Sequence, residues 1–413
     1  MSSRLLLLRL LWLCPFFVGC SAHYVYETRD IRALADQHKE PEAIAALDAA
    51  ESANHYDELL YQLDRGAWLH RSGAYAESTR MLNAAADLAD RRETVSFSEE
   101  LLGKAPWRMG TLERQALHVL NTINYLELNQ PDDAVVEARL TDSLLIQGRL
   151  EEKFREQFER NISLAPFDED IRDYLERLVI GRYLSGIAHE LSGNQEDAFI
   201  DYYDAWKLSR SAPPGAPTHV EHLGPWLLRN AKLLGRKELP ELERDVSATD
   251  VPSGGELIVI IEAGKVPERA IEGPEGQGHW TVKARSWSHH KAIVEVSNQR
   301  VEAQTVTSLE NIQLRRGYLG AMSDTERNSS FAVNAVMLGL YIVAWPVMFP
   351  VVIRRAWEVN IRLAQAWLAL PAEFQIARLS VPLGTQHVLV DGKPFDVTVS
   401  PKRPALLIVV QPE

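Results

Sequence analysis

The chain is poor in cysteine: of its 413 residues only Cys14 and Cys20 carry a thiol. A disulfide framework, a thiolate zinc site and a cysteine nucleophile are therefore excluded after residue 20. Positive charge is also scarce, since 44 lysines and arginines stand against 57 acidic residues, for a net charge of −13. Because nucleic-acid binding needs a surplus of lysine and arginine to neutralise phosphates, we predict no nucleic-acid partner.

Motifs of the common catalytic classes are also missing. The sequence has no HExxH, no GxSxG and no phosphate-binding glycine loop. His279, His289 and His290 could be taken for a metal cluster, but adjacent residues on a strand point to opposite faces and cannot readily chelate one ion. We expect exposed strand histidines, and no metal, no cofactor and no enzymatic activity.

The N-terminus has the pattern of a secretory leader. An apolar run follows Arg4 and Arg9 and ends in the sequence FVGC at 17–20, after which the chain turns polar. Gly19 directly before Cys20 resembles the lipobox of bacterial lipoproteins. The resemblance implies removal of a leader, a thioether-linked diacylglycerol on the cysteine and an acylated new amino terminus. The alternative is an ordinary signal peptide that is cut elsewhere.

The lipobox sets the expected location. A signal peptide over 1–19 would be removed, and the mature chain would be anchored to a membrane through Cys20. Ser21 rather than aspartate follows the cysteine, which by resemblance to known sorting behaviour favours the outer membrane, facing the periplasm, over the inner membrane.

The first part of the mature chain, 20–240, is predicted to be α-helical. Alanine, leucine, glutamate and arginine dominate it, with apolar residues at three- and four-residue spacing. Two stretches share a pattern of glycines, small residues and apolar residues at matching offsets. They are Gly66, Gly73, Leu82 and Ala85 in one stretch, and Gly186, Gly193, Tyr202 and Ala205 in the other. This resembles the tetratricopeptide (TPR) repeat, in which glycine lets two antiparallel helices approach and alanines let the next repeat stack. A generic helical bundle is the alternative.

Stacked helix pairs leave a concave groove that binds peptides or partner helices. Its residues would come from the first helix of each pair, where aromatic, arginine and histidine side chains are candidates for partner contact. The candidates are Tyr61, Arg65, Trp68, Tyr125, Arg182 and His189. Alternatively, these side chains pack between repeats.

The second part, 241–413, is predicted to be β-rich. Residues 255–264 form a short apolar, β-branched run bounded by glycines, which is typical of a buried strand. Alternating patterns over 279–308 predict two or three strands. Residues 372–411 predict strands separated by PLGT, DGK and SPKRP turns. The fold class is therefore α+β and mainly α: a TPR-like solenoid, then a small β-sandwich-like domain built from both sides of an insertion.

The insertion, 328–353, contains no charged residue. The run from Phe331 to Ile353 is long enough to span a bilayer core, although Pro346 and Pro350 interrupt helical hydrogen bonding. A buried hairpin, a shallow interfacial insertion and a true span all stay open. The candidates for membrane contact are Phe331, Leu338, Trp345 and Phe349.

Three stretches carry a wider resemblance, at 113–139, at 255–270 and at 366–385. Together with the lipobox they resemble bacterial TPR-containing lipoproteins of unknown function over almost the whole mature chain. Gln365-Ala366-Trp367 departs from the Arg-Ser-Trp motif usual there, and the middle segment of those proteins is less apolar than 331–353. The resemblance implies an envelope location and association with other envelope-assembly lipoproteins.

The sequence thus predicts a lipid-anchored envelope scaffold or adaptor that binds a protein partner through helical repeats. The alternative is a membrane-embedded, oligomeric component of an envelope assembly or export complex that uses 331–353. The identity of the partner and the existence of a homo-oligomer stay open.

Overall fold

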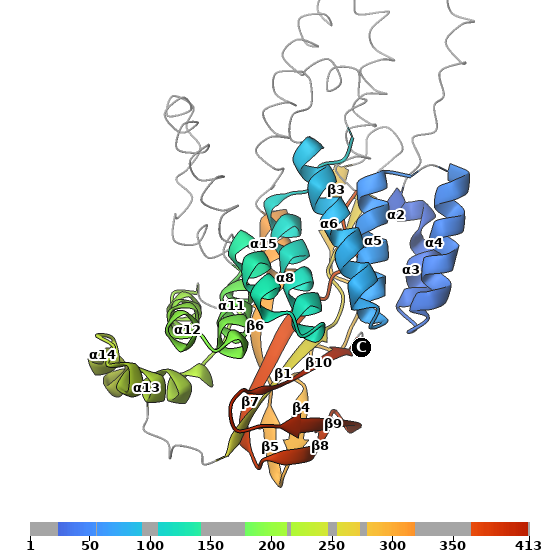
Figure 1. Cartoon of the computed structure of the whole chain (residues 1–413). Coiled ribbons are helices and arrows are strands. Elements are labelled where there is room, and N and C mark those ends of the chain that lie inside the picture. The colour runs from blue at the N-terminus through green and yellow to red at the C-terminus, as the bar shows by residue number, and fades with distance from the viewer. Residues whose placement is uncertain are drawn as a thin grey trace, which may run out of the picture.

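The computed structural model describes residues 24–54, 56–92, 106–141, 178–212, 216–246, 254–272, 279–318 and 365–411. This part of the chain is α+β, and all of its strands follow residue 254 (Figure 1). The predicted lipidation site Cys20 and the predicted membrane contacts in 328–353 lie outside the described residues. Among the described ranges, no helix combines the length and apolarity needed to cross a bilayer.

Most of the described helices lie before the first strand. Their bounds are α2 (Tyr24–Glu27), α3 (Arg29–Ala35), α4 (Glu40–Asn54), α5 (Glu58–Arg71), α6 (Tyr75–Arg92), α8 (Thr111–Glu127), α11 (Val179–Ser192), α12 (Gln195–Arg210), α13 (Leu223–Leu234), α14 (Leu239–Asp245) and α15 (Leu309–Tyr318). A further helix covers 131–141. Three helix pairs result: α5 with α6, α8 with 131–141, and α11 with α12.

Local sequence explains where these helices begin and end. The side chain of Asp57 accepts hydrogen bonds from the backbone amides of Leu59 and Leu60, which caps the start of α5. Gly193 ends α11 with φ of 83°, a left-handed conformation that glycine adopts without strain. Gly73 has φ of 80° in the corresponding turn between α5 and α6.

The predicted close approach of paired helices at glycine is confirmed. A Cβ atom added to Gly66 would lie 2.8 Å from the Leu82 side chain, and one added to Gly186 would lie 2.5 Å from the Tyr202 ring. A larger residue would therefore force the Leu82 side chain to shift at the first crossing and the buried Tyr202 ring to shift at the second. Assignment of the pairs to the TPR class stays a prediction.

The strands form two four-stranded sheets and one two-stranded sheet. Their bounds are β1 (Gly255–Ala263), β2 (Glu268–Glu272), β3 (His279–Lys283), β4 (Ile293–Val296), β5 (Gln299–Glu302), β6 (Gln304–Ser308), β7 (Glu373–Val381), β8 (Gly384–Val390), β9 (Lys393–Val399) and β10 (Ala405–Gln411). The strand order is β10-β1-β7-β6 in the first sheet and β5-β4-β8-β9 in the second, and β2 pairs with β3. As expected, strands from both sides of the predicted insertion share these sheets.

Strand β1 is buried on both faces, and its residues alternate between two hydrophobic cores. Ile258 and Ile260 belong to the core shared with the helices, whereas Leu257 and Val259 belong to the core between the two four-stranded sheets. β1 pairs in parallel with β10 and antiparallel with β7. The fold is therefore three layers, in the order helices, first sheet and second sheet.

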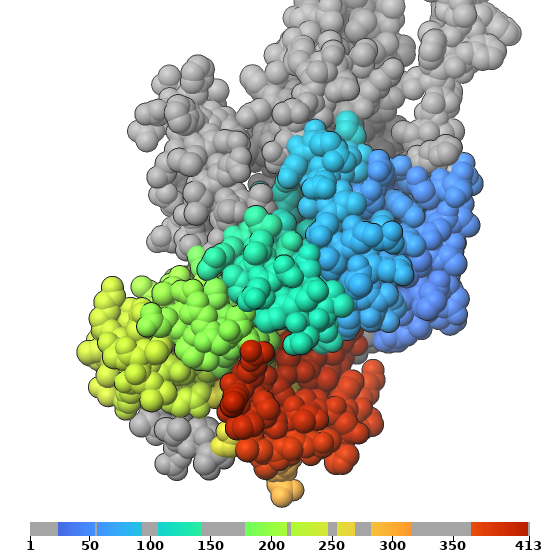
Figure 2. Space-filling model, in the orientation of Figure 1, coloured from blue at the N-terminus to red at the C-terminus, as the bar shows by residue number. Residues whose placement is uncertain are grey.

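The first helix of each pair faces the first sheet. His70 of α5 lies 2.7 Å from Glu262 of β1. The backbone amide of Ile180 at the start of α11 donates to the Thr307 hydroxyl of β6 at 3.0 Å. Asn124 of α8 also takes part, because its Oδ1 atom lies 2.6 Å from Nδ1 of His70. In Figure 2 the C-terminal strands, in red, lie directly against the blue to green helices.

One local expectation is wrong. His289 and His290 do not lie on a strand, because β3 ends at Lys283 and β4 begins at Ile293. His290 is 2.7 Å from Asp391, and His289 is 3.5 Å from Glu310. The two side chains are partly exposed and pair with different carboxylates.

Candidate functional site

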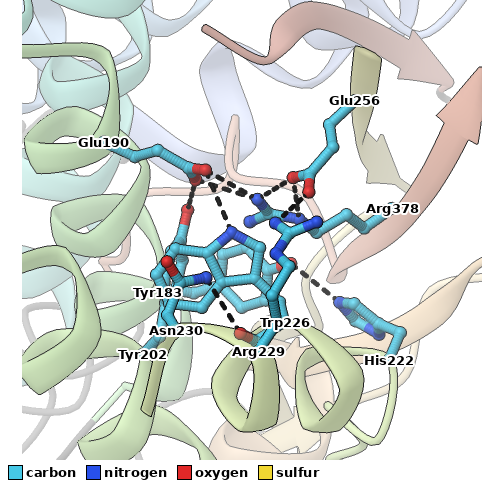
Figure 3. Close-up of polar contacts among 9 residues, drawn as sticks. All are labelled: Tyr183, Glu190, Tyr202, His222, Trp226, Arg229, Asn230, Glu256 and Arg378. Carbon is cyan, nitrogen blue, oxygen red and sulfur yellow. Dashed lines mark hydrogen bonds and ion pairs between the residues drawn. The ribbon is translucent and has the colours of Figure 1, made fainter. Parts of the chain in front are cut away.

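A cluster of buried polar contacts lies between the helices and the first sheet (Figure 3). Arg378 is at its centre, on the face of β7 that also carries Phe374 and Ile376 toward the helices. Only 5% of its side chain is exposed. Because side chains alternate along a strand, the cation of Arg378 lies on the same face as these two apolar residues. We call this cluster the Arg378 cluster.

Two glutamates from different layers bind Arg378. Its Nη2 atom donates to both carboxylate oxygens of Glu190 in α11, at 2.8 and 3.0 Å. Glu256 of β1 also accepts from Arg378 and from Arg229 of α13. Two carboxylates therefore face two guanidiniums, and the formal charges of these four groups cancel.

Aromatic side chains complete the surroundings of Arg378. The hydroxyl of Tyr202 donates to Glu190 at 2.8 Å, and the indole nitrogen of Trp226 donates to the same carboxylate at 3.0 Å. The Cζ atom of Arg378 lies 5.4 Å from the Tyr202 ring centre and 5.1 Å from that of Trp226. Both distances are within the range of cation–π attraction.

Electrostatics keeps the cluster ionised. Burial alone would raise the pKa of Glu256, but Arg378 and then Arg229 outweigh burial, and the pKa is lowered. Burial would lower the pKa of Arg378, yet Glu190 and its other neighbours raise it. The cluster therefore holds fixed charges that stabilise one another.

A neutral histidine borders the cluster. The Oε1 atom of Gln304 lies 2.5 Å from Nδ1 of His222 and also accepts from the His222 backbone amide. Nδ1 therefore carries the proton, and Nε2 accepts from the Tyr183 hydroxyl at 2.8 Å. Burial lowers the pKa of His222 to about 4, and the bond to Gln304 opposes this shift only in part.

A second buried ion pair joins α5 to the opposite end of β1. Nε2 of His70 lies 2.7 Å from Glu262, and Nδ1 lies 2.6 Å from Oδ1 of Asn124. The Asn124 amide nitrogen donates to the Ser78 hydroxyl, so its Oδ1 is the acceptor toward His70. Both imidazole nitrogens therefore donate, and the ring is charged. Burial would lower the pKa of His70, but Glu262 and Asn124 raise it above its ordinary value.

The Arg378 cluster and the His70–Glu262 pair stabilise the contact between the helices and the first sheet. Their charged groups are paired with one another and largely buried. The sequence did not identify these residues as a site, and only Tyr202 was named, as part of the repeat pattern. A signal was present in β1, where Glu256, Ile258, Ile260 and Glu262 share the face toward the helices. A glutamate at each end of a buried, apolar strand face requires a nearby cation, which α5 and α13 supply from the helical layer and β7 supplies from the same sheet.

An open hollow lies on another part of the helical layer, between α6, α8 and 131–141. Its volume is about 420 Å³. The lining is Asn83, Ala86, Asp87, Ala89, Asp90, Met109, Arg114, Leu117, His118, Glu137 and Leu140. Arg114 pairs with Asp90 and His118 with Glu137, each at 2.7 Å. The lining thus combines apolar side chains with three acidic groups, two of which are paired with Arg114 and His118. We call it the α6–α8 hollow.

The predicted groove residues of α5 do not form one surface. Trp68 is 1% exposed and packs in the helical core, so its side chain has no access to a partner in this structure. The Tyr61 hydroxyl and the Arg65 guanidinium both donate to Asp48 of α4 at 2.9 Å. Tyr61 and Arg65 thus bridge neighbouring helices.

The other predicted groove residues bridge helices in the same way. The Tyr125 hydroxyl accepts from Asn83 of α6 at 3.5 Å. Arg182 donates to Asp201 of α12 at 2.8 Å, and His189 lies 3.7 Å from the same carboxylate. These contacts fit the alternative interpretation, in which the side chains pack between helices.

Among the described residues, no group of three or more histidine, cysteine, aspartate or glutamate side chains is placed to hold a metal ion. No protein-family model matches the chain, and no curated protein sequence shows significant similarity to it.

Proposed function

We propose that the protein is a lipid-anchored scaffold or adaptor of the bacterial cell envelope, in which the helical layer binds a segment of a partner protein at the α6–α8 hollow. Acylation of Cys20 would supply the anchor. The observation that favours this site over the predicted concave groove is the docking of the first sheet on α5 and α11, which removes that face from the surface.

The shape and charge of the hollow suggest the chemistry of the partner. A volume of about 420 Å³ falls within the range of small ligand pockets and accommodates a few side chains rather than a folded surface. Leu140, which is 37% exposed, provides apolar contact, and Asp87 adds negative charge, whereas Glu137 is paired with His118. We infer a partner segment in which apolar residues are flanked by lysine or arginine.

The alternative, a membrane-embedded assembly that uses 331–353, meets a constraint from topology. β6 lies before this part of the chain and β7 after it, and the two strands pair in one sheet. β6 and β7 therefore lie on the same side of any membrane. A single crossing between them is incompatible with the sheet, which favours the lipid-anchored adaptor.

Charge reversal in the hollow tests partner binding. We expect Asp87→Arg to lower the amount of crosslinked partner recovered from envelopes at least tenfold, because it repels a basic segment. Glu77→Arg is the matched control, since Glu77 is an exposed acidic residue of the same helix outside the hollow lining. Equal recovery with both variants would remove the hollow as the binding site.

Cys20→Ala tests the anchor separately. We expect the wild-type chain to incorporate labelled palmitate and to sediment with membranes, and the variant to do neither. If the variant stays in the membrane fraction after a carbonate wash, acylation is not the only attachment, and the membrane-embedded alternative gains support.

A further inference from the structure

In the described chain the two four-stranded sheets end in four edge strands, β5, β6, β9 and β10. An edge strand presents unpaired backbone N–H and C=O groups, and proteins usually protect it by short length, charge, proline or a covering segment. β6 is covered, because the backbone amide of His219 donates to the Thr305 carbonyl at 2.7 Å. β5 is short, with four residues, and two of them, Arg300 and Glu302, are charged and exposed.

β9 is protected by its composition. Lys393, Pro394 and Asp396 are all exposed on this strand. Proline has no backbone N–H and cannot donate to a further strand, and a charged side chain on an edge opposes the approach of another sheet. Three of the four edges therefore carry a recognisable protection against pairing with another chain.

β10 has none of these protections among the described residues. It is seven residues long, Ala405–Gln411, and contains no charged residue and no proline. Its pairing with β1 runs without a bulge over its whole length, and β1 is the only strand in the described ranges that pairs with it. Leu406, Leu407, Ile408 and Val410 are half-buried. The last strands, dark red in Figure 2, lie at the surface of the face shown. The outer edge of β10 is thus suited to accept a further strand.

We propose that β10 pairs antiparallel with β10 of a second copy of the chain, which joins the two first sheets into one continuous sheet. A two-fold dimer of this kind uses the same surface of both copies, so the strand must be complementary to itself. With Ile408 opposite its own copy, all seven residues of β10 pair: Leu407 lies opposite Val409, and Leu406 lies opposite Val410. These pairs are apolar and bring no like charges together, and such cross-strand pairs stabilise a sheet. β10 therefore meets the requirement of self-complementarity.

The same arrangement matches the layers of the two copies. Leu406 and Ile408 pack against the core shared with the helices, whereas Leu407 packs against the core between the two four-stranded sheets. A two-fold axis perpendicular to the sheet keeps each of these faces on its own side, so helices continue beside helices and second sheet beside second sheet. No residue of β10 lines the α6–α8 hollow, so dimerisation and the proposed partner binding use different residues. A contact through one pair of strands is small, which predicts a monomer–dimer equilibrium rather than a permanent dimer.

Disulfide crosslinking tests both the pairing and its register. The mature chain with Cys20→Ala contains no thiol, so an introduced cysteine is unique. In Ile408→Cys the two new cysteines would be directly opposite each other, with Cα atoms roughly 4.5–5.5 Å apart, a separation that a disulfide can bridge. In the matched control Leu406→Cys they would be offset by about 13 Å along the strands, which is too far. We expect a covalent dimer under mild oxidation at position 408 and at least tenfold less of it at position 406.

Sedimentation velocity measures the dimer without a crosslink. We expect the Cys20→Ala chain to form dimers as its concentration rises, and Ile408→Lys, which puts two ammonium groups opposite each other, to raise the dissociation constant at least tenfold. Thr398→Lys adds the same charge to an exposed position of β9 and should sediment as its parent does. Far-UV circular dichroism checks that each variant is folded, and if Ile408→Lys is not, the two cysteine variants decide. The proposal is wrong if the parent chain stays monomeric at every concentration, or if positions 406 and 408 crosslink equally.

Discussion

Replacement of Arg378 by leucine removes the cation that joins three elements, α11, β1 and β7. Glu190 would keep its bonds from Tyr202 and Trp226 but would lose its ion pair, with 6% of its side chain exposed. Leaving one partner of a buried ion pair uncompensated costs about 3–5 kcal/mol. We expect Arg378→Leu to lower the free energy of unfolding by an amount in this range.

Urea denaturation followed by far-UV circular dichroism measures this cost. Arg300→Leu is the matched control, because the Arg300–Glu295 pair is 3.6 Å long with 71% and 45% of the side chains exposed. An exposed pair of this kind contributes about 0–1 kcal/mol. Arg378→Lys is expected to fall between the two, since lysine keeps the charge but cannot bind two carboxylates with a planar fork.

The reasoning is refuted if Arg378→Leu costs no more than Arg300→Leu. That result would mean that Glu190 and Glu256 relax toward solvent, or that the helices and the sheet unfold independently. A first unfolding transition that involves only the helices would support the second explanation.

Three further predictions concern pH and packing. The pKa of His70 is raised in the folded state, so the charged ring stabilises the fold fully below its unfolded pKa of about 6.5, and this contribution is lost as pH rises through the folded value. Urea denaturation should therefore show that His70→Gln lowers stability more at pH 6 than at pH 9. The pKa of Glu256 is lowered in the folded state, so its carboxylate stabilises the fold above an unfolded pKa of about 4.3, and this contribution is lost as pH falls through the folded value. The stability of Glu256→Gln should therefore equal that of wild type only in acid. Gly186→Ala places a methyl group 2.5 Å from the Tyr202 ring and should cost about 1–3 kcal/mol by thermal denaturation. An equal cost at all pH values, or a neutral Gly186→Ala, would contradict these assignments.

Local patterns predicted the parts of the fold that local physics determines. The turn at Asp391 and Gly392 has both residues at positive φ, 48° and 77°, as an Asp-Gly hairpin requires. The glycines at the helix crossings were recognised from their spacing to small and apolar residues. The run at 255–264 predicts a buried strand because apolar, β-branched residues fill it between glycines, and β1 covers Gly255–Ala263.

Long-range pairing is what the sequence did not predict. β1 pairs with β10 and β7, which lie more than a hundred residues further along the chain, and no local pattern encodes which face of the sheet meets the helices. A tryptophan such as Trp68 has the same helical spacing whether it faces a groove or a core. The candidate groove residues were therefore assigned to a surface, although their contacts join neighbouring helices.

The central claim is that a partner protein binds at the α6–α8 hollow, and site-specific photocrosslinking in intact envelopes tests it most directly. A benzophenone amino acid would replace Leu140, which lines the hollow and is 37% exposed, or Ile200 of α12, which is 41% exposed and serves as the matched control. We predict a discrete protein adduct from position 140 and none from position 200. An adduct from position 200 alone, or from neither position, would contradict the account.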